Sequence, residues 1–207
     1  MSLRGWLDDA ERVDVAVYAA VARTPTPTLD RAFGRLSRAA DYSRLSLAAA
    51  VLLAAGGGRS GRRAARHGLV AVGLTSLAVN ALAKPLGARR RPDRVTSDVP
   101  VARHVRMPVS GSFPSGHAAS AFAFATGVGH VLPVPAVPLH ALAGLVGYAR
   151  VHTGVHYPGD VIIGALLGTA VAQLTAHALD RHGSHLLPDG ARLTRPPGPW
   201  LKRPPRR

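Results

Sequence analysis

The stretch RVHTGVHYPGD, residues 150–160, is a polar interruption in an otherwise apolar part of this 207-residue chain. It runs into DVIIGALLGTAVAQLTAHALD, residues 160–180, the clearest apolar helix of the sequence. Five residues separate Arg150 from His156, and three separate His156 from Asp160. A guanidinium, an imidazole and a carboxylate are costly to place among apolar helices unless they share a partner. The stretch therefore predicts a polar binding site at the end of a helix.

The distribution of charge indicates a membrane protein. Hydrophobic residues make up 47% of the chain, and the formal net charge is +15. The positive charge lies between and after the apolar stretches, in RSGRRAAR at 59–66, in 84–106 and in 181–207. This arrangement is typical of a polytopic membrane protein rather than of a basic nucleic-acid groove, so we expect no nucleic-acid partner. Cysteine is absent, which excludes disulfide and thiolate chemistry.

Five apolar segments predict the spanning helices of an all-α transmembrane bundle. They cover residues 45–58, 68–83, 117–132, 137–149 and 160–180. Small residues in the last segment, such as Gly164 and Gly168, would let neighbouring helices approach closely. The expected regions are an N-terminal interfacial helical region (1–42), a membrane domain (43–180) and a basic, disordered cytoplasmic tail (181–207).

The connections between these segments divide over two sides of the membrane. Residues 59–66 and the tail fall on one side, and the loops 84–116 and 150–158 fall on the other. The positive-inside tendency places the first pair in the cytoplasm, so both loops face outward. Because the basic residues of 84–106 go against that tendency, they need another reason to be there. Residues 1–28 are too charged to span the bilayer and are expected to form an amphipathic helix at its surface, without a cleavable signal peptide.

The first outward loop begins and ends in unusual motifs. KPLGARRRP places six residues between Lys84 and Arg91, and FPSGH occupies residues 113–117. Proline is favoured at the first position of a helix, so Pro114 predicts the start of the third span and Pro158 the start of the fifth. The amides of the two first turns would then lack intrahelical acceptors and be free to bind a ligand.

These features converge on a phosphate-binding pocket. Two helix N-termini, each with free N–H groups and a partial positive charge, would point at one place. Lys84, Arg91 and Arg150 add the charge that an anion of about two negative charges requires, and the fork of arginine suits phosphate oxygens. Gly116 would let the ligand approach the backbone closely, beside the amide of Ser115.

Two histidines supply the groups that phosphoryl transfer uses. A neutral imidazole can attack phosphorus when a carboxylate holds its other nitrogen, and His156 with Asp160 fits that role. A second histidine can protonate the leaving oxygen and later activate water, and His117 fits that role. We expect no metal, since no set of histidines and carboxylates has metal-ligand spacing.

The remaining basic side chains have simpler interpretations. Arg89, Arg90 and Arg94 are interpreted as a solvated cluster that binds lipid headgroups. His152 is expected to be a loop residue without a catalytic role. Packing or interfacial roles are expected for His130, His140 and His177.

Together the three segments resemble the signature of the type 2 phosphatidic acid phosphatase superfamily. Its motifs K-x6-RP, PSGH and SR-x5-H-x3-D stand here as Lys84-x6-Arg91-Pro92, Pro114 to His117, and Arg150-x5-His156-x3-Asp160. Ala149 replaces the usual serine before the arginine, which affects one hydrogen bond and no catalytic role. The resemblance covers residues 84–160, and the helical pattern around them extends it to roughly 40–180.

The resemblance implies an all-helical membrane phosphatase of five or six spans, with a core like that of the vanadium haloperoxidases and with no metal or cofactor. It implies a phosphohistidine on His156, with His117 acting as acid and then as base. The residues that match its phosphate-binding positions are Lys84, Arg91, Ser115, Gly116 and Arg150. The expected substrate is a lipid phosphate or diphosphate, and the expected site faces the extracytoplasmic side of the cell membrane.

The sequence leaves the substrate and the oligomeric state open. Polyprenyl diphosphate, polyprenyl-phosphoryl sugar phosphates, phosphatidic acid and phosphatidylglycerophosphate all suit a pocket at headgroup depth, and a homo-oligomer is compatible with the sequence. One alternative is a vanadate-dependent haloperoxidase, although those enzymes are large and soluble. Another is a lipid-phosphate-binding protein without activity. The paired histidines argue against it, because anion binding needs neither a nucleophile nor an acid.

Overall fold

The structure, a computed structural model, describes residues 2–87 and 89–185, and every regular element in these ranges is a helix. The longer helices are α1 (Leu3–Arg23), α2 (Pro27–Ala39), α3 (Arg44–Gly56), α4 (Gly58–Ala78), α6 (Gly116–Gly129), α7 (Pro133–His152) and α8 (Pro158–His185). The short ones are the 3-10 turns η1 (Asp41–Ser43) and η3 (Val101–Arg103), the π-helical turn η2 (Val79–Ala83) and the single turn α5 (Lys84–Leu86).

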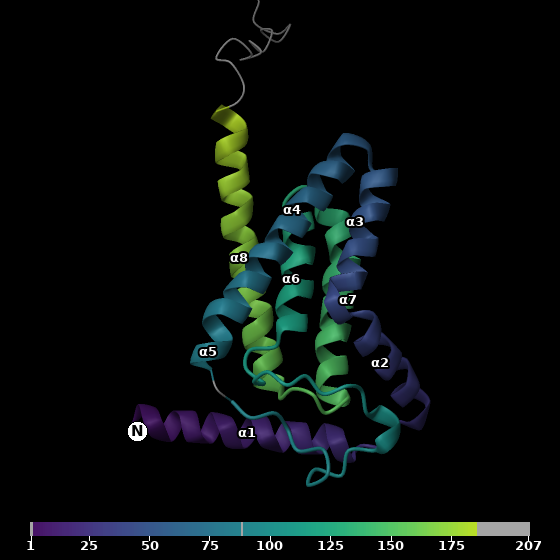
Figure 1. The fold of residues 1–207 in the computed structure, drawn as a ribbon, viewed down its shortest axis with the longest axis vertical. Coiled ribbons are helices and arrows are strands. Elements are labelled where there is room, and N and C mark those ends of the chain that lie inside the picture. Colours follow the sequence, from purple (N-terminus) through teal and green to yellow (C-terminus); the bar gives the residue numbers. More distant parts are fainter. Residues whose placement is uncertain (1, 88, 186–207) are drawn as a thin grey trace, which may run out of the picture.

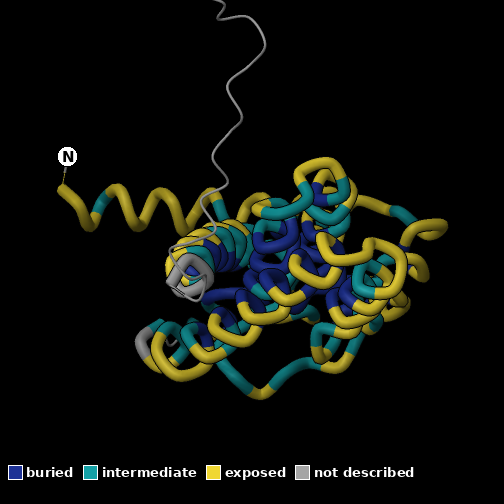
Figure 2. The backbone as a smooth tube through the Cα atoms, turned by 90° about the horizontal axis from the view of Figure 1, so that it is seen from above, coloured by how far each residue is buried: buried dark blue, intermediate teal, exposed yellow. Residues whose placement is uncertain are grey.

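Helix α6 lies at the centre of the bundle, where it contacts α4, α7 and α8 (Figure 1). Its sequence, GHAASAFAFATGVG, consists mainly of small residues, and four of its alanines are fully buried. Small side chains allow helix backbones to come close together, so α6 can be surrounded on several sides. Viewed along the bundle, buried residues fill the middle and exposed residues form the rim (Figure 2).

Helices α6 and α8 cross closely at two glycines. A Cβ atom added to Gly164 would lie 2.5 Å from the carbonyl oxygen of Ser115, and one added to Gly168 would overlap the carbonyl oxygen of Ala119. A larger residue at either position would push the helices apart. The prediction that small residues in this segment allow close approach is confirmed, and the crossing holds the beginnings of α6 and α8 together.

Two helix boundaries differ from those expected from the sequence. Residues 59–66, expected as a connection, belong to the first part of α4, because arginine and alanine favour helix. The corner between α3 and α4 lies instead at Gly57 and Gly58, where Gly58 has a φ of 57°. Helix α7 extends to His152, so Arg150 and His152 belong to its last turn. The expectation that His152 is a loop residue was therefore wrong.

The N-terminal region forms two helices at one end of the bundle. Helix α1 runs across this end, and α2 begins at the last proline of TPTP, residues 24–27, and contacts α7 (Figure 1). The first half of α1 projects beyond the bundle with Trp6 and Leu7 exposed (Figure 2). A helix over most of 1–28 is confirmed, while its position at a membrane surface stays a prediction.

The loops that carry the motifs share one end of the molecule. The segments between α5 and α6 and between α7 and α8 both lie where α1 crosses the bundle, whereas the α3–α4 corner lies at the opposite end (Figure 1). In the described part of the chain, two helices are long and apolar enough to cross a membrane, Pro133–His152 and Pro158–Arg181. Helices α3 and α6 have 13 and 14 residues, fewer than the roughly 20 that a bilayer core takes. The count of five or six spans stays a prediction, and the expected tail lies largely outside the described residues.

Candidate active site

The three sequence motifs meet at the loop end of the bundle through hydrogen bonds to the backbone. Arg91 donates from Nε to the carbonyl of Ser110 and from Nη1 to the carbonyl of Val155, both at 2.9 Å. The backbone N–H of Ser115 donates to the carbonyl of Asp160, also at 2.9 Å. Segments far apart in the sequence therefore form one polar cluster.

His156 lies in the loop between α7 and α8 and is only 2% exposed. Its Nε2 is 3.2 Å from Arg91 Nη1, and its Nδ1 is 3.5 Å from Asp160 Oδ2. A guanidinium can only donate hydrogen bonds, so Nε2 must present its lone pair to Arg91. The neutral ring then carries its proton on Nδ1, facing Asp160. This is the tautomer of an imidazole that attacks through Nε2.

Asp160 is fully buried in the first turn of α8 and is held from several directions. Its Oδ2 accepts hydrogen bonds from the hydroxyl of Ser112 and, at 2.9 Å, from the backbone N–H of Tyr157. Its Oδ1 accepts from Arg89 Nη1 at 3.1 Å. These donors fix the plane of the carboxylate, and the carboxylate in turn orients the ring of His156.

The surroundings of His156 favour its uncharged form. Burial is the largest cause and lowers the pKa of His156 to about 4. The hydrogen bond to Asp160 acts in the opposite direction, while the charges of Arg91 and Arg150 lower the pKa further. At neutral pH the ring is therefore neutral, as a nucleophile must be.

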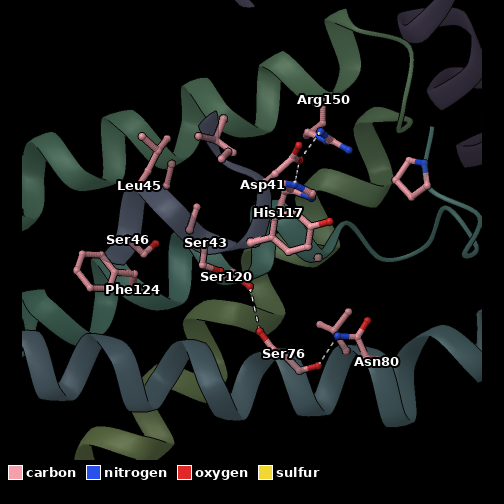
Figure 3. Close-up of a pocket in the computed structure, with 18 of the residues that line it drawn as sticks. Asp41, Ser43, Leu45, Ser46, Ser76, Asn80, His117, Ser120, Phe124 and Arg150 are labelled. Atoms are coloured by element: carbon pink, nitrogen blue, oxygen red, sulfur yellow. Dashed lines mark hydrogen bonds and ion pairs between the residues drawn. The ribbon is translucent and has the colours of Figure 1, made fainter. Parts of the chain in front are cut away.

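His117 and Arg150 face a carboxylate that no sequence motif indicated. His117, in the first turn of α6, has its Nε2 2.9 Å from Asp41 Oδ1, and Arg150 Nη1 lies 3.9 Å from the same oxygen. Arg150 is 2% exposed and donates to Ser37 Oγ at 2.8 Å. Its buried Nε has no partner within the ranges that the structure describes. Figure 3 shows Asp41, His117 and Arg150 together on one wall of a pocket.

This pocket is a cavity of about 530 Å³ with a polar end and apolar walls. Its polar end is lined by Asp41, Lys84, Ser110, Gly116, His117 and Arg150. Its apolar walls include Leu45, Phe124, Leu139, Leu142 and Val146. Lys84 donates from Nζ to Ser110 Oγ at 3.2 Å and also lines a second hollow, of about 510 Å³, together with Arg91. A cavity of this composition suits a molecule with an anionic head and an apolar body.

The start of α6 differs from the sequence-based expectation. The helix begins at Gly116 rather than at Pro114, with Ser115 as its N-cap. The serine hydroxyl accepts a hydrogen bond from the first turn, which satisfies an amide that a proline could not reach. Ser115 is fully buried and its own N–H is bound to Asp160, so that amide is not free, and its role as a phosphate ligand stays a prediction. Pro158 does begin α8, as predicted.

Two of the three arginines interpreted as solvated are bound within the cluster. Arg89 forms ion pairs with Asp14 and Asp160, and its side chain is 23% exposed. Arg94 donates hydrogen bonds to two backbone carbonyls. The interpretation was wrong for both, because the loop folds back over the helix ends and encloses them. Arg90 is exposed, as that interpretation requires.

Three polar residues of the cluster were missed by sequence reasoning: the donor Ser112 and the acceptors Asp14 and Asp41. Ser112 stands immediately before FPSGH, and its closeness to that motif was a usable signal. Asp14 and Asp41 come from the N-terminal region, more than 40 residues before the first motif. No spacing in the sequence links them to it.

Comparisons of the sequence identify relatives that are phosphatases by name. A profile of the PAP2 superfamily matches residues 65–184. The decaprenylphosphoryl-5-phosphoribose phosphatase of Mycobacterium tuberculosis H37Rv is 38% identical over 99 residues, which are 47% of this chain and 51% of that protein. The lipid A 1-phosphatase of Rhizobium etli is 34% identical over 137 residues, 63% of this chain and 57% of that protein. This chain thus spans little more than half the length of these relatives.

Two solved structures share the fold. Aquifex aeolicus LpxE has a TM-score of 0.64 and 27% identity, covering 79% of this chain and 94% of that one. A transmembrane PAP2-type phosphatidylglycerolphosphate phosphatase from Bacillus subtilis has a TM-score of 0.65 and 26% identity, covering 84% and 87%. The profile match contains the whole stretch from Lys84 to Asp160 in which the cluster is built. This protein belongs to the PAP2 superfamily.

Proposed function

We propose that this protein is a multi-pass membrane phosphatase that hydrolyses a lipid phosphate or diphosphate through a phosphohistidine on His156. The observation that carries the proposal is the state of that side chain. His156 is buried, its Nε2 lies 3.2 Å from Arg91 Nη1, and its Nδ1 lies 3.5 Å from a fixed carboxylate, an arrangement that favours a neutral ring with its proton on Nδ1. This arrangement leaves Nε2 with the lone pair that an attack on phosphorus requires.

In the first half-reaction, Nε2 of His156 attacks phosphorus and the bond from phosphorus to the leaving oxygen breaks. Asp160 stabilises the positive charge that develops on the ring, because Nδ1–H points at it. His117 donates a proton to the leaving oxygen. Lys84 and Arg150, which line the polar end of the cavity, neutralise the phosphoryl oxygens.

In the second half-reaction, His117 takes a proton from a water molecule that attacks the phosphohistidine. The bond from nitrogen to phosphorus breaks, inorganic phosphate leaves, and His156 returns to its neutral form. Each histidine ends in its starting state. The rest of the catalysis is positioning and charge neutralisation by the surrounding cations.

The shape of the cavity supports a lipid as the substrate. Its apolar walls offer a place for the apolar part of the molecule, next to a cationic end for the phosphate. The named relatives are phosphatases of decaprenylphosphoryl-5-phosphoribose, lipid A and phosphatidylglycerolphosphate, so lipids that carry phosphate are the class to test. We place the site on the extracytoplasmic side, because it lies at the end opposite the arginines of residues 59–66.

Phosphate release from purified protein tests the proposal directly. A panel of polyprenyl diphosphate, phosphatidic acid and phosphatidylglycerophosphate should include at least one substrate, and radiolabelled substrate should transiently label the wild-type protein. His156→Ala should abolish both release and labelling, which corresponds to a loss of at least about a thousandfold for a nucleophile. His177→Ala is the matched control, since this exposed histidine of α8 contacts only its own helix backbone among the hydrogen bonds of the described chain. Near-normal phosphate release by His156→Ala would contradict the assignment of His156 as the nucleophile.

Chelation separates this mechanism from a metal-dependent one. In residues 2–87 and 89–185, no group of three or more histidine, cysteine or acidic side chains is arranged to hold a metal ion. We expect the rate of phosphate release to be unchanged in EDTA, because the chain supplies both the nucleophile and the acid itself. A strict requirement for an added divalent cation would point to a different mechanism.

A further inference from the structure

The N-terminal helix α1 reaches the catalytic cluster through one side chain. Asp14 lies in the middle of α1, and its side chain is 12% exposed. Its Oδ1 accepts a hydrogen bond from the backbone N–H of Gly159 at 2.7 Å, and its Oδ2 accepts from Arg89 Nη1 at 2.7 Å. One carboxylate thus caps the beginning of α8 from outside and anchors a guanidinium beside it.

Arg89 in turn joins Asp14 to the buried carboxylate of Asp160. The Nη1 that binds Asp14 also donates to Asp160 Oδ1 at 3.1 Å. The guanidinium carbon lies 4.0 Å from the centroid of the Tyr157 ring, so stacking limits how the group can turn. Arg89 is therefore fixed by contacts with three residues from two parts of the chain.

The Asp14–Arg89 pair holds Oδ1 of Asp160, to which no other described residue donates a hydrogen bond. Oδ2 is held by Ser112 and by the amide of Tyr157, whereas Arg89 is the donor to Oδ1 among the described residues. Without Arg89, a fully buried carboxylate oxygen loses its partner, which is costly, and the carboxylate is then held through Oδ2 alone and can turn more easily. Rotation would move Oδ2 away from Nδ1 of His156.

We infer that Asp14 and Arg89 are positioning residues for the His156–Asp160 pair, so that helix α1 is required for catalysis. The inference rests on the proposed function, and neither residue is assigned a contact with the reacting atoms. Asp14 lies outside the stretch matched by the family profile, residues 65–184, so the family resemblance does not supply it. The arrangement makes an element outside the matched region part of the active site.

Kinetics of matched variants test the inference. Arg89→Gln should lower kcat about ten- to a hundredfold and change KM by no more than about twofold. A loss of this size is typical of residues that orient a functional group through a hydrogen bond without contacting the substrate. Asp14→Asn should lower kcat by a smaller factor, and Arg89→Lys should retain more activity than Arg89→Gln. The double variant Asp14→Asn/Arg89→Gln should be within about twofold of Arg89→Gln alone, because Asp14 acts on Asp160 through Arg89 and an asparagine oxygen can still accept from the N–H of Gly159. Glu11→Gln is the control, since Glu11 is on the same helix, 3.9 Å from Arg89, but 68% exposed.

Independent, multiplying losses in the double variant would mean that Asp14 does not act through Arg89 and would overturn the inference. The inference would also be overturned if Arg89→Gln and Asp14→Asn changed only KM, or if their kcat equalled that of the wild type. Amide hydrogen exchange over residues 155–161 provides a readout without turnover. Exchange at Tyr157 should speed up in Arg89→Gln and at Gly159 in Asp14→Asn, with no change in Glu11→Gln. If the wild-type protein released no phosphate from any lipid, the proposed function would fail, and unchanged exchange in the variants would separately reject the inference.

Discussion

The environment of His156 sets the pH range in which this residue can act as a nucleophile. Its pKa is lowered to about 4, whereas an ordinary histidine titrates near 6.5. Protonation occupies the Nε2 lone pair, so nucleophilicity is lost only as the pH falls through the folded pKa. An exposed histidine in the same role would lose half of its activity at about pH 6.5.

The decline of kcat/KM at acidic pH should therefore occur at a lower pH than an ordinary histidine would give. We expect kcat/KM, which reports ionisations of the free enzyme, to show no loss due to His156 between about pH 7 and pH 5 and to decline only near pH 4. The profile is measured on the wild-type protein and corrected for the ionisation of the substrate phosphate, followed by 31P NMR. A decline that stays centred near 6.5 after this correction would show that the ring is not shielded as the structure indicates.

The residues of the site divide into those that the sequence could predict and those that it could not. Arg150, His156 and Asp160 were predictable because one helix end and one short loop hold them at a fixed spacing. Asp14 and Arg89 were not, because their importance comes from an ion pair across 75 positions of the chain. One arginine in a run of three gives no sign of the carboxylate that it will meet.

The helix starts also include one that the sequence could predict and one that it could not. Pro158 begins α8 as predicted, because a proline at the first helical position needs no partner for its missing N–H. The start of α6 was predicted two residues too early, because Ser115 offers a side-chain cap. The arginine-rich residues 59–66 are helical rather than a connection, since the glycines at 57 and 58 already make the corner. Where two local signals compete, the sequence alone does not decide between them.

The crossing of α6 and α8 gives a prediction about packing. Gly164→Ala would place a methyl group 2.5 Å from the carbonyl of Ser115, an overpacking expected to cost about 1–3 kcal/mol. Because the amide of Ser115 is bound to the carbonyl of Asp160, separating the helices here should also lower kcat. Thermal unfolding in detergent and phosphate release measure the two effects.

Gly144→Ala in α7 is the matched control for this change. A Cβ added to Gly144 meets no atom within 4 Å, so alanine should leave activity unchanged and stabilise the helix by about 0.5–1 kcal/mol. Equal stability and equal activity of the two variants would show that the crossing tolerates a wider separation than the structure has. A loss at Gly144 alone would contradict the packing described here.

At the scale of the whole described bundle, the basic segments divide between its two ends. The motif loops lie at one end of the bundle and the α3–α4 corner with its arginines lies at the other, as the sequence predicted (Figure 1). The number of spans could not be predicted in the same way, because alanine-rich helices of 13 and 14 residues suit a soluble core as well as a thin part of a bilayer. The membrane orientation therefore needs a measurement of its own.

The absence of cysteine from the sequence makes that measurement direct. Thr96→Cys places a thiol in the loop near the site, and Ser60→Cys places one near the α3–α4 corner at the opposite end. Thr96 and Ser60 are both exposed. On intact cells, a membrane-impermeant maleimide should label Thr96→Cys and should label Ser60→Cys only after the membrane is opened, since cytoplasmic loops carry the excess of arginine. Both variants should release phosphate at the wild-type rate, because neither side chain lines the cavity. The reverse labelling pattern would place the active site in the cytoplasm, and labelling of both thiols on intact cells would mean that the bundle does not separate them across a bilayer.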